Sequence, residues 1–141
     1  MHTNFSIILP CFNENDNIHE LYKELLSLNL HDLYIEVIFV NNGSVDNTGI
    51  KIDEIIDIST KSENLNFFIT KLALEKNLGY GGGIIAGLKI AKGNWIALLD
   101  ADDYFSPEKL EKVKDAILKN SFDVFLNSEW ISGYDEKFKE I

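Results

Sequence analysis

Trp95-Ile96-Ala97-Leu98-Leu99-Asp100-Ala101-Asp102-Asp103 is an apolar run that ends abruptly in three carboxylates. The uncharged run predicts a buried strand, and charged groups that follow such a strand lie at the edge of a sheet, where water and ligands are found. Asp100 and Asp102, separated by one small residue, can direct oxygen ligands towards one hard divalent cation, which commonly bridges a protein carboxylate and substrate phosphates. Acidic residues after a strand also often only solvate a turn or cap the next helix. The metal site is therefore a hypothesis that other parts of the chain must support.

The composition is typical of a single globular domain. The chain has 141 residues, of which 45% are hydrophobic and 26% charged, so we expect one domain over residues 1–141 with a sizeable core. No stretch approaches the roughly eighteen apolar residues of a membrane span. The N-terminus lacks the basic and apolar regions of a signal peptide, which predicts a cytoplasmic location. Peripheral contact with the inner face of the membrane is left open.

The charge and the few reactive side chains exclude several classes of function. The formal net charge is −10 and every basic residue is a lysine, so there is no arginine-rich face for nucleic acid. Cys11 is the only cysteine and has no nearby His or Lys in sequence to lower its pKa, which favours a packing role over a nucleophile. The three histidines lack metal-ligand spacing, so zinc is not indicated.

Five apolar segments recur along the chain and predict parallel strands. They begin about thirty residues apart, which is the length of one strand-helix-strand unit. Helical patterns between them predict an α/β, Rossmann-like fold with a mostly parallel sheet and helices on both faces. The predicted strands are Phe5–Leu9, which Pro10 stops, Tyr34–Val40, a third that begins at Leu65–Ile69, Trp95–Leu99 and Phe122–Leu126.

Four helices are expected between these strands. Their starts are predicted from capping residues, and the third is predicted to follow a glycine-rich turn. The expected positions are a first helix capped by Asn15 or Asp16 and running to about Leu28, a second capped by Ser44 or Asp46 and running to about Ile58, a third between the turn Asn77–Gly83 and Gly93, and a fourth from Ser106-Pro107.

Every unusual segment follows a strand. The segments 10–14, 41–44, 77–83 and 100–103 should therefore meet at one rim of the sheet, where ligands of such sheets bind. The glycines of 79–83 leave room for a phosphate at a helix N-terminus, or they form an unliganded turn. The segment matches neither a P-loop nor a dinucleotide fingerprint.

Two side chains at this rim suit a nucleotide base. Phe12 is an aromatic residue in a polar loop and could stack on a base, although a lone aromatic more often packs on its own domain. Asn42 offers one acceptor and two donors to a base edge, and its alternative role is that of a turn residue.

An ordered set of motifs resembles the family 2 glycosyltransferases of the GT-A fold. The resemblance covers about residues 5–131, and Asp-Ala-Asp with Gly-Tyr-Gly-Gly-Gly is most similar to the polyprenyl- or dolichyl-phosphate sugar transferases. The matching segments are Ile8-Leu9-Pro10-Cys11-Phe12-Asn13-Glu14, Val40-Asn41-Asn42-Gly43-Ser44-Val45-Asp46-Asn47-Thr48, Asn77-Leu78-Gly79 and Leu99-Asp100-Ala101-Asp102-Asp103.

The resemblance implies a role for each matching position. Phe12 would lie beside the base, and Glu14 and Asn42 would contact the nucleoside. Asp100 to Asp102 would bind the donor diphosphate through Mg2+ or Mn2+, with Asp100 and Asp102 as metal ligands. The predicted nucleotide-sugar site comprises Pro10, Phe12, Glu14, Asn41, Asn42, Gly79, Asp100, Ala101 and Asp102.

Two departures from the family pattern affect this prediction. The family usually has aspartates where this chain has Asn41 and Asn42, which leaves the identity of the nucleotide open. It also often has Lys or Arg within Tyr80–Ala86. Without one, the diphosphate charge falls mainly on the metal and on backbone amides.

The implied activity is an inverting, metal-dependent transfer from a nucleotide-diphosphate sugar to an acceptor hydroxyl or a lipid phosphate. Family members need a second half for the acceptor and the general base, so we expect this chain to be the donor-binding half, truncated before that part. Glu129, Asp135 and Glu136 are available, but no general base is assigned. One alternative is a module that binds a nucleotide sugar without turnover. Another is a nucleotidyltransferase, which is disfavoured because the basic motif of that class near the first loop is missing. A homo-oligomer is left open.

Overall fold

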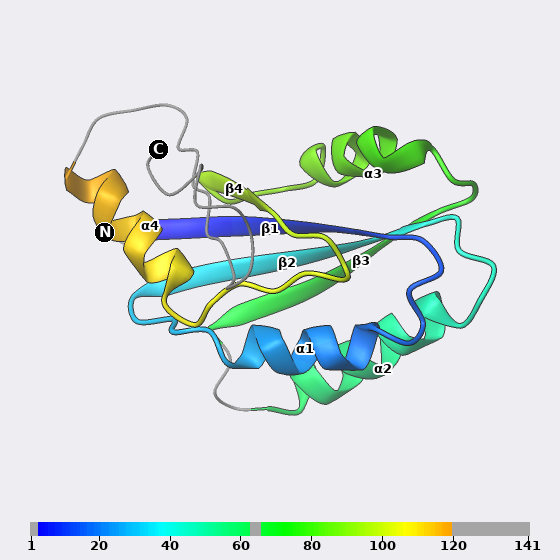
Figure 1. The fold of residues 1–141 in the computed structure, drawn as a ribbon, viewed down its shortest axis with the longest axis horizontal. Coiled ribbons are helices and arrows are strands. Elements are labelled where there is room, and N and C mark those ends of the chain that lie inside the picture. Colours follow the sequence, from blue (N-terminus) through cyan, green and yellow to red (C-terminus); the bar gives the residue numbers. More distant parts are fainter. Residues whose placement is uncertain (1–2, 63–65, 120–141) are drawn as a thin grey trace, which may run out of the picture.

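The computed structural model describes residues 3–62 and 66–119, which form an α/β arrangement of strands and helices in alternation (Figure 1). The four strands of this part are all parallel and lie in the order β3-β2-β1-β4. The predicted α/β fold is confirmed. The elements are β1 (Thr3–Cys11), α1 (Ile18–Leu26), β2 (Leu33–Asn42), α2 (Thr48–Thr60), β3 (Phe67–Leu74), α3 (Gly79–Leu88), β4 (Trp95–Leu98) and α4 (Lys109–Lys119).

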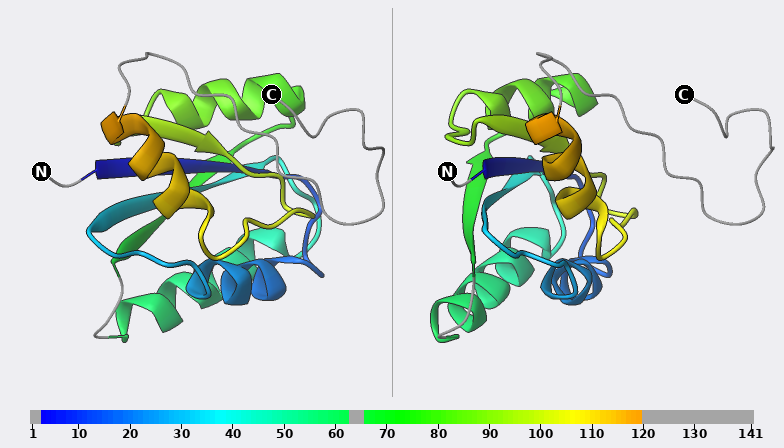
Figure 2. Two further views of the ribbon diagram at one scale, coloured as in Figure 1. Left: turned by 60° about the vertical axis from the view of Figure 1, so that its left-hand side comes forward. Right: turned by 90° about the vertical axis from the view of Figure 1, so that its left-hand side faces the viewer.

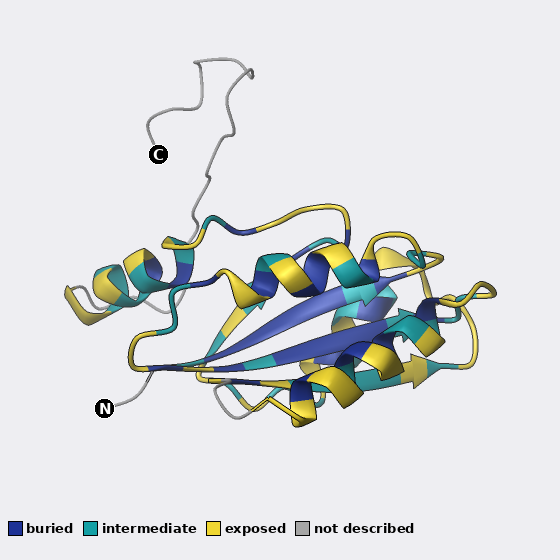
Figure 3. Cartoon of the chain, turned by 90° about the horizontal axis from the view of Figure 1, so that it is seen from below, coloured by how far each residue is buried: buried dark blue, intermediate teal, exposed yellow. Residues whose placement is uncertain are grey.

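Helices cover both faces of the sheet, as the sequence predicts. Figure 2 shows the sheet between α3 on one side and α1 with α2 on the other. Because successive side chains of a strand point to opposite faces, Ile7 and Leu9 of β1 join the larger core between the sheet and helices α1 and α2, whereas Ile8 faces α3. Central strands β1 and β2 are buried along most of their length (Figure 3).

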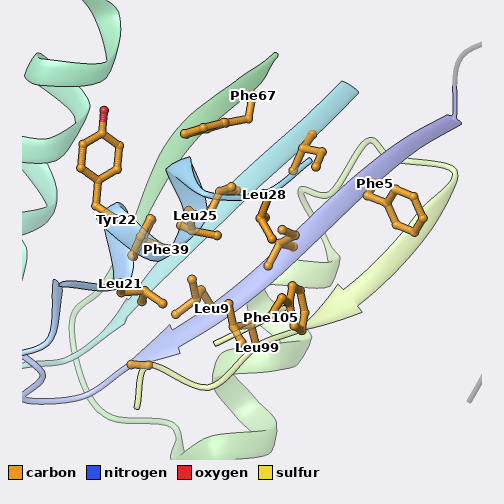
Figure 4. Packing of buried hydrophobic residues seen from close by; sticks show 14 of the residues in the cluster. Phe5, Leu9, Leu21, Tyr22, Leu25, Leu28, Phe39, Phe67, Leu99 and Phe105 are labelled. Carbon is orange, nitrogen blue, oxygen red and sulfur yellow. The ribbon is translucent and has the colours of Figure 1, made fainter. Parts of the chain in front are cut away.

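The larger core is aromatic and aliphatic, and it reaches from the sheet to three helices. Figure 4 shows Leu21, Tyr22 and Leu25 of α1 in one cluster with Phe39 and Phe67 of the sheet. The Tyr22 and Phe67 rings meet edge to face, with centroids 6.5 Å apart. Leu110 and Val113 place α4 against the same core. This packing fixes the ends of the strands, from which the loops of the site extend.

The glycine-rich segment is helical, so the predicted turn at Asn77–Gly83 is wrong for most of its length. Gly79–Gly83 form the beginning of α3, and the helix ends at Leu88, not at Gly93. The buried residues of α3 are Gly83 and Gly87, because the helix lies very close to the sheet. A Cβ atom on Gly87 would lie 2.7 Å from Cγ2 of Ile8. Glycine is therefore needed for this close approach of helix and sheet.

The helix caps differ from those predicted. Asn17 precedes α1, so Asn15 and Asp16 do not cap it, and the Asn17 amide donates to the Glu14 carboxylate at 2.7 Å instead. Asn47 precedes α2 without a capping side chain. Asp46 nevertheless accepts the N–H of the first residue of this helix, Thr48, at 2.9 Å.

The run that ends in carboxylates is an edge strand in the described part of the chain, not the fully buried strand predicted. Ile96 and Leu98 are 41% and 49% exposed, whereas Leu99 and Ala101 are buried. The strand pairs with β1 only from Phe5 to Ile8. It shows the alternation of a half-covered strand, which the uniformly apolar sequence conceals.

Pro10 does not stop β1, which continues to Cys11. Pro10 pairs in register with Val40 of β2, and on its other side β4 has already ended. A residue without an N–H is tolerated there because no ladder bond is needed on that side.

Some predictions lie outside the described residues. These are the fifth strand at Phe122–Leu126, Leu65 of the third strand, and the carboxylates Glu129, Asp135 and Glu136. Among the helices that are described, none combines the length and the apolar character that a membrane crossing demands.

Candidate functional site

The loops that follow β1, β3 and β4 border one hollow of about 370 Å³ at the carboxyl ends of the strands. We call it the strand-end hollow. It brings together eight of the nine predicted site residues, and only Asn41 is not among those that line it. Its lining consists of Pro10, Cys11, Phe12, Glu14, Asn42, Asn77, Gly79, Tyr80, Asp100, Ala101 and Asp102.

A larger hollow of about 540 Å³ lies away from these loops, on the α3 face of the sheet. It is lined mainly by apolar or neutral side chains, including Tyr34 and Phe68. Its one carboxylate, Glu36, accepts hydrogen bonds from Ser6 Oγ at 2.7 Å and from the Lys92 N–H at 3.0 Å. This hollow is larger than the strand-end hollow, but its described lining includes none of the predicted site residues and no cluster of metal-binding groups. We therefore place the candidate site at the strand-end hollow.

Three carboxylates converge beside the strand-end hollow. Asp100, Asp102 and Asp103 each offer an oxygen, and these oxygens lie within 4.8 Å of one another. Asp103 belongs to the cluster because its N–H donates to the Asp100 carbonyl at 3.0 Å, which turns the chain back. Oxygen donors of this kind and spacing suit a hard cation such as Mg2+ or Mn2+. The residues present therefore fit the predicted metal.

Tyr80 contacts this cluster, which the sequence analysis did not foresee. Its hydroxyl donates to Asp100 Oδ1 at 2.6 Å. This hydrogen bond, together with partial burial and the charges of Asp100 and Asp103, raises the pKa of Tyr80 to about 12. The phenol is therefore a neutral donor at physiological pH. The contact spans 20 residues in sequence, from the beginning of α3 to the loop after β4, so no local pattern predicts it.

Phe12 directly follows β1, is 45% exposed and lines the strand-end hollow. The next residue, Asn13, has a left-handed backbone with φ of 54°. Its N–H donates to Ser44 Oγ at 3.0 Å, and its Oδ1 accepts from the Val45 N–H at 3.0 Å. These two hydrogen bonds join the loops after β1 and β2 and hold the turn that exposes Phe12.

Glu14 is held by the same pair of loops. Its N–H donates to Thr48 Oγ1 at 2.8 Å, and the neighbouring N–H of Asn15 donates to Asp46 Oδ2 at 3.2 Å. Asp46 also accepts from the Thr48 hydroxyl at 2.5 Å, and these hydrogen bonds lower the pKa of Asp46. Asp46 and Thr48 therefore position the loop of Glu14, a role that the sequence analysis missed because it considered Asp46 only as a helix cap.

Asn42 is only 3% exposed, and its amide is occupied by backbone groups. Its Nδ2 donates to the Gly79 carbonyl at 2.9 Å, and its Oδ1 accepts from the Leu78 N–H at 2.9 Å. The side chain thus connects the end of β2 to the beginning of α3. This geometry favours a structural role over the predicted contact with a nucleoside. Asn41 accepts from the Ser44 N–H at 3.3 Å.

The N-terminus of α3 borders the same hollow. Gly79 has a left-handed φ of 77°, and its N–H donates to Asn77 Oδ1 at 2.7 Å. The first turn of a helix leaves N–H groups without intrahelical partners, and these favour anions. Tyr80, Gly81 and Gly82 lie in this turn. None of the described residues that line the strand-end hollow is basic, so neutral groups such as backbone amides are the donors that they offer to an anion.

Cys11 lines the hollow but is not a nucleophile. Its side chain is buried, and burial with the nearby charge of Glu14 raises its pKa to about 12. A thiol in that state does not ionise near neutral pH. The geometry supports the predicted packing role.

Comparisons with known proteins show which proteins this chain is similar to. The family model described as "Glycosyl transferase family 2" matches residues 6–139. The chain is 30% identical over 128 residues to a dolichol-phosphate mannosyltransferase of Pyrococcus furiosus, covering 91% of this chain and 34% of that protein. It is 34% identical over 112 residues to an uncharacterized glycosyltransferase of Mycoplasma genitalium, covering 77% of this chain and 35% of that protein. The chain thus spans about a third of the length of these relatives.

Solved structures show the same fold. S. aureus TarS 1–349 in complex with UDP-GlcNAc is 27% identical with a TM-score of 0.68, over 83% of this chain and 32% of that one. A mannosyltransferase of Pyrobaculum calidifontis, solved with GDP-Man and Mn2+, is 18% identical with a TM-score of 0.64, over 78% of this chain and 31% of that one. The second likeness extends to the fold alone.

Proposed function

This chain belongs to glycosyl transferase family 2, and we propose that it is the part of such an enzyme that binds a nucleotide-diphosphate sugar through a divalent cation. The donor would lie in the strand-end hollow, with its base towards Phe12 and its diphosphate between the carboxylates and the N-terminus of α3. The convergence of Asp100, Asp102 and Asp103 within 4.8 Å, beside that hollow, is the observation that carries the proposal.

The charges of the hollow favour a cation-dependent donor site. A diphosphate approaching Asp100 and Asp102 would meet charge of its own sign, and no Lys in the described part of the chain lines the strand-end hollow to offset it. These carboxylates would hold a divalent cation, which would supply positive charge to offset this repulsion. Asp102, the more exposed of the two predicted ligands, is the residue on which we expect binding of the cation to depend most.

In the proposed reaction, the acceptor oxygen forms a bond to the anomeric carbon while the bond from that carbon to the diphosphate oxygen breaks. The electron pair of the broken bond leaves with the nucleoside diphosphate, and the configuration at the anomeric carbon inverts. Bound metal would neutralise the charge that develops on the diphosphate. The residues of this chain orient the donor and exclude water on one side, and the general base that takes the acceptor proton is not assigned to a described residue.

Calorimetry with the purified 141-residue chain tests the donor site. UDP, GDP and dTDP are titrated in Mn2+ and, as the control, in EDTA. We expect at least one of the three to bind in Mn2+, with affinity that is lost in EDTA because the carboxylates and the diphosphate then repel each other. Equal affinity in the two buffers would remove the cation from the proposal.

Binding without transfer is the second candidate, and one observation favours it. Among the described residues, the carboxylates that line the strand-end hollow are Glu14, Asp100 and Asp102. Glu14 accepts a hydrogen bond from the Asn17 amide at 2.7 Å, Asp100 accepts one from the Tyr80 hydroxyl at 2.6 Å, and Asp102 is a proposed metal ligand, so none of them is assigned as a general base. Release of nucleoside diphosphate in the presence of an acceptor distinguishes the two functions. An acceptor-dependent release shows transfer, and binding without such release shows a module that only holds the donor.

A further inference from the structure

Tyr80 is the one aromatic side chain of the described residues whose hydroxyl reaches the carboxylate cluster. It is the second residue of α3 and is 58% exposed, so it contributes little to the core. Its hydroxyl nevertheless lies 2.6 Å from Asp100 Oδ1. An exposed tyrosine that makes such a short bond to a proposed metal ligand calls for an explanation other than packing.

The backbone on both sides of this bond is fixed. On the α3 side, Asn42 holds the Leu78 N–H and the Gly79 carbonyl, immediately before Tyr80. On the β4 side, the Leu99 N–H donates to the Ile8 carbonyl at 3.1 Å, immediately before Asp100. The Tyr80 side chain therefore connects two backbone segments that hydrogen bonds hold in place, and its length determines where the Asp100 carboxylate lies.

We infer that Tyr80 is a positioning residue for the proposed cation: its hydroxyl holds Oδ1 of Asp100, so that this carboxylate stays beside Asp102 and Asp103, where a cation would be held. The inference rests on the proposed function. Tyr80 does not itself coordinate the cation in this account, because its hydroxyl is the donor of a hydrogen bond to a ligand. It acts through Asp100.

The physical need for such a donor follows from the charges. Asp100, Asp102 and Asp103 bring three carboxylate oxygens within 4.8 Å of one another, and like charges at that distance repel each other. Without a fixed partner, Asp100 would turn away from its neighbours in the absence of metal. A neutral hydroxyl holds the carboxylate in place by a hydrogen bond and leaves its negative charge available to a cation. Groups that hydrogen-bond to metal ligands generally act in this way.

The position of Tyr80 between two hollows adds to the argument. Tyr80, Asp100 and Asp102 line the strand-end hollow and also an adjoining hollow of about 310 Å³, which Tyr104 and Lys109 line as well. The bonded pair thus forms part of the wall between the two hollows. Loss of the hydroxyl would leave the Asp100 side chain, the proposed metal ligand, free to rotate.

The test measures Mn2+ binding to the full 141-residue chain by electron paramagnetic resonance, in which the signal of the free ion is lost on binding. The variant is Tyr80→Phe, which removes the hydroxyl and keeps the ring. The matched control is Tyr104→Phe, because Tyr104 borders the same carboxylates from the adjoining hollow without a hydrogen bond to them in the described structure. Thermal unfolding of each metal-free chain is recorded in parallel.

We expect Tyr80→Phe to weaken Mn2+ binding by about 10- to 100-fold, the usual effect of removing a group that orients a ligand, with an unchanged melting temperature. Tyr104→Phe should bind Mn2+ like the wild type. Three results would overturn the inference alone: equal or tighter Mn2+ binding by Tyr80→Phe, an equal loss in Tyr104→Phe, or a loss that accompanies a large fall in melting temperature. A wild-type chain that binds no Mn2+ would overturn the proposed function as well.

Discussion

Replacing Gly43 by alanine tests how closely the loops of the site fit together. Gly43 follows β2 directly and has a left-handed φ of 71°. A Cβ atom at this position would overlap the backbone of Lys76 and Asn77, in the loop before α3. Gly79 provides a matched control, because its φ is 77° but a Cβ atom there would meet nothing within 4 Å.

The two substitutions share one energetic cost and differ in a second. A left-handed backbone costs a residue with a Cβ atom roughly 1–2 kcal/mol, which applies to both Gly43→Ala and Gly79→Ala. Only Gly43→Ala must also displace a backbone segment, and overpacking of this kind typically costs about 1–3 kcal/mol. We therefore expect about 1–2 kcal/mol of destabilisation for Gly79→Ala and about 2–5 kcal/mol for Gly43→Ala.

Urea unfolding of the two variants and the wild type measures these free energies, with the slope of each transition checked for equality. The larger loss in Gly43→Ala is the expected result. If Gly43→Ala is no less stable than Gly79→Ala, the loops after β2 and β3 do not touch as described, and the anchoring of Asn42 to the start of α3 loses its basis.

Three further predictions concern single side chains of the site. Asn42→Asp should lower the free energy of unfolding by about 1–3 kcal/mol in urea, because a carboxylate cannot donate to the Gly79 carbonyl. Asn41→Asp keeps the oxygen that accepts from Ser44, so it should lower this free energy by less in the same experiment. Phe12→Ala should weaken binding of the nucleoside diphosphate by about 1–3 kcal/mol in calorimetry while the domain stays folded, and unfolding of the variant would show that the ring is core. Cys11 has a folded pKa of about 12 against an ordinary value of 9.0, so the unfolded state ionises first and stability should fall as pH rises from 9 towards 12. Cys11→Ala should show a smaller fall over that range in urea unfolding at each pH, and identical pH profiles would contradict the buried thiol.

The strand period and the meeting of the loops at one rim could be predicted from the sequence, because both follow from local patterns. Apolar runs report burial, and parallel strands must bring their carboxyl ends to the same edge. Asp100 and Asp102 lie at that edge for this reason. The exposure of Ile96 and Leu98 could not be predicted, because an apolar residue looks the same in sequence whether or not a neighbouring element covers it.

The contacts that complete the site could not be predicted because they join residues distant in sequence. Asn13 meets Ser44 across 31 residues, and Tyr80 meets Asp100 across 20. Asn42 illustrates the same limit: its side chain offers the same donors and acceptor to a base or to a backbone, and only the close approach of α3 decides that the backbone takes them. Polar residues near a ligand site therefore divide into those that face the ligand and those that hold the loops.

The most direct test of the central claim compares the wild type with Asp102→Asn in thermal unfolding, with and without Mn2+ and nucleoside diphosphate. Without ligands, Asp102→Asn should be as stable as the wild type or slightly more so, because one of three neighbouring charges is removed. With Mn2+ and nucleoside diphosphate, the wild type should melt at a higher temperature and Asp102→Asn should not, because the cation has lost a ligand. A ligand-induced shift that survives in Asp102→Asn would contradict the proposed donor site.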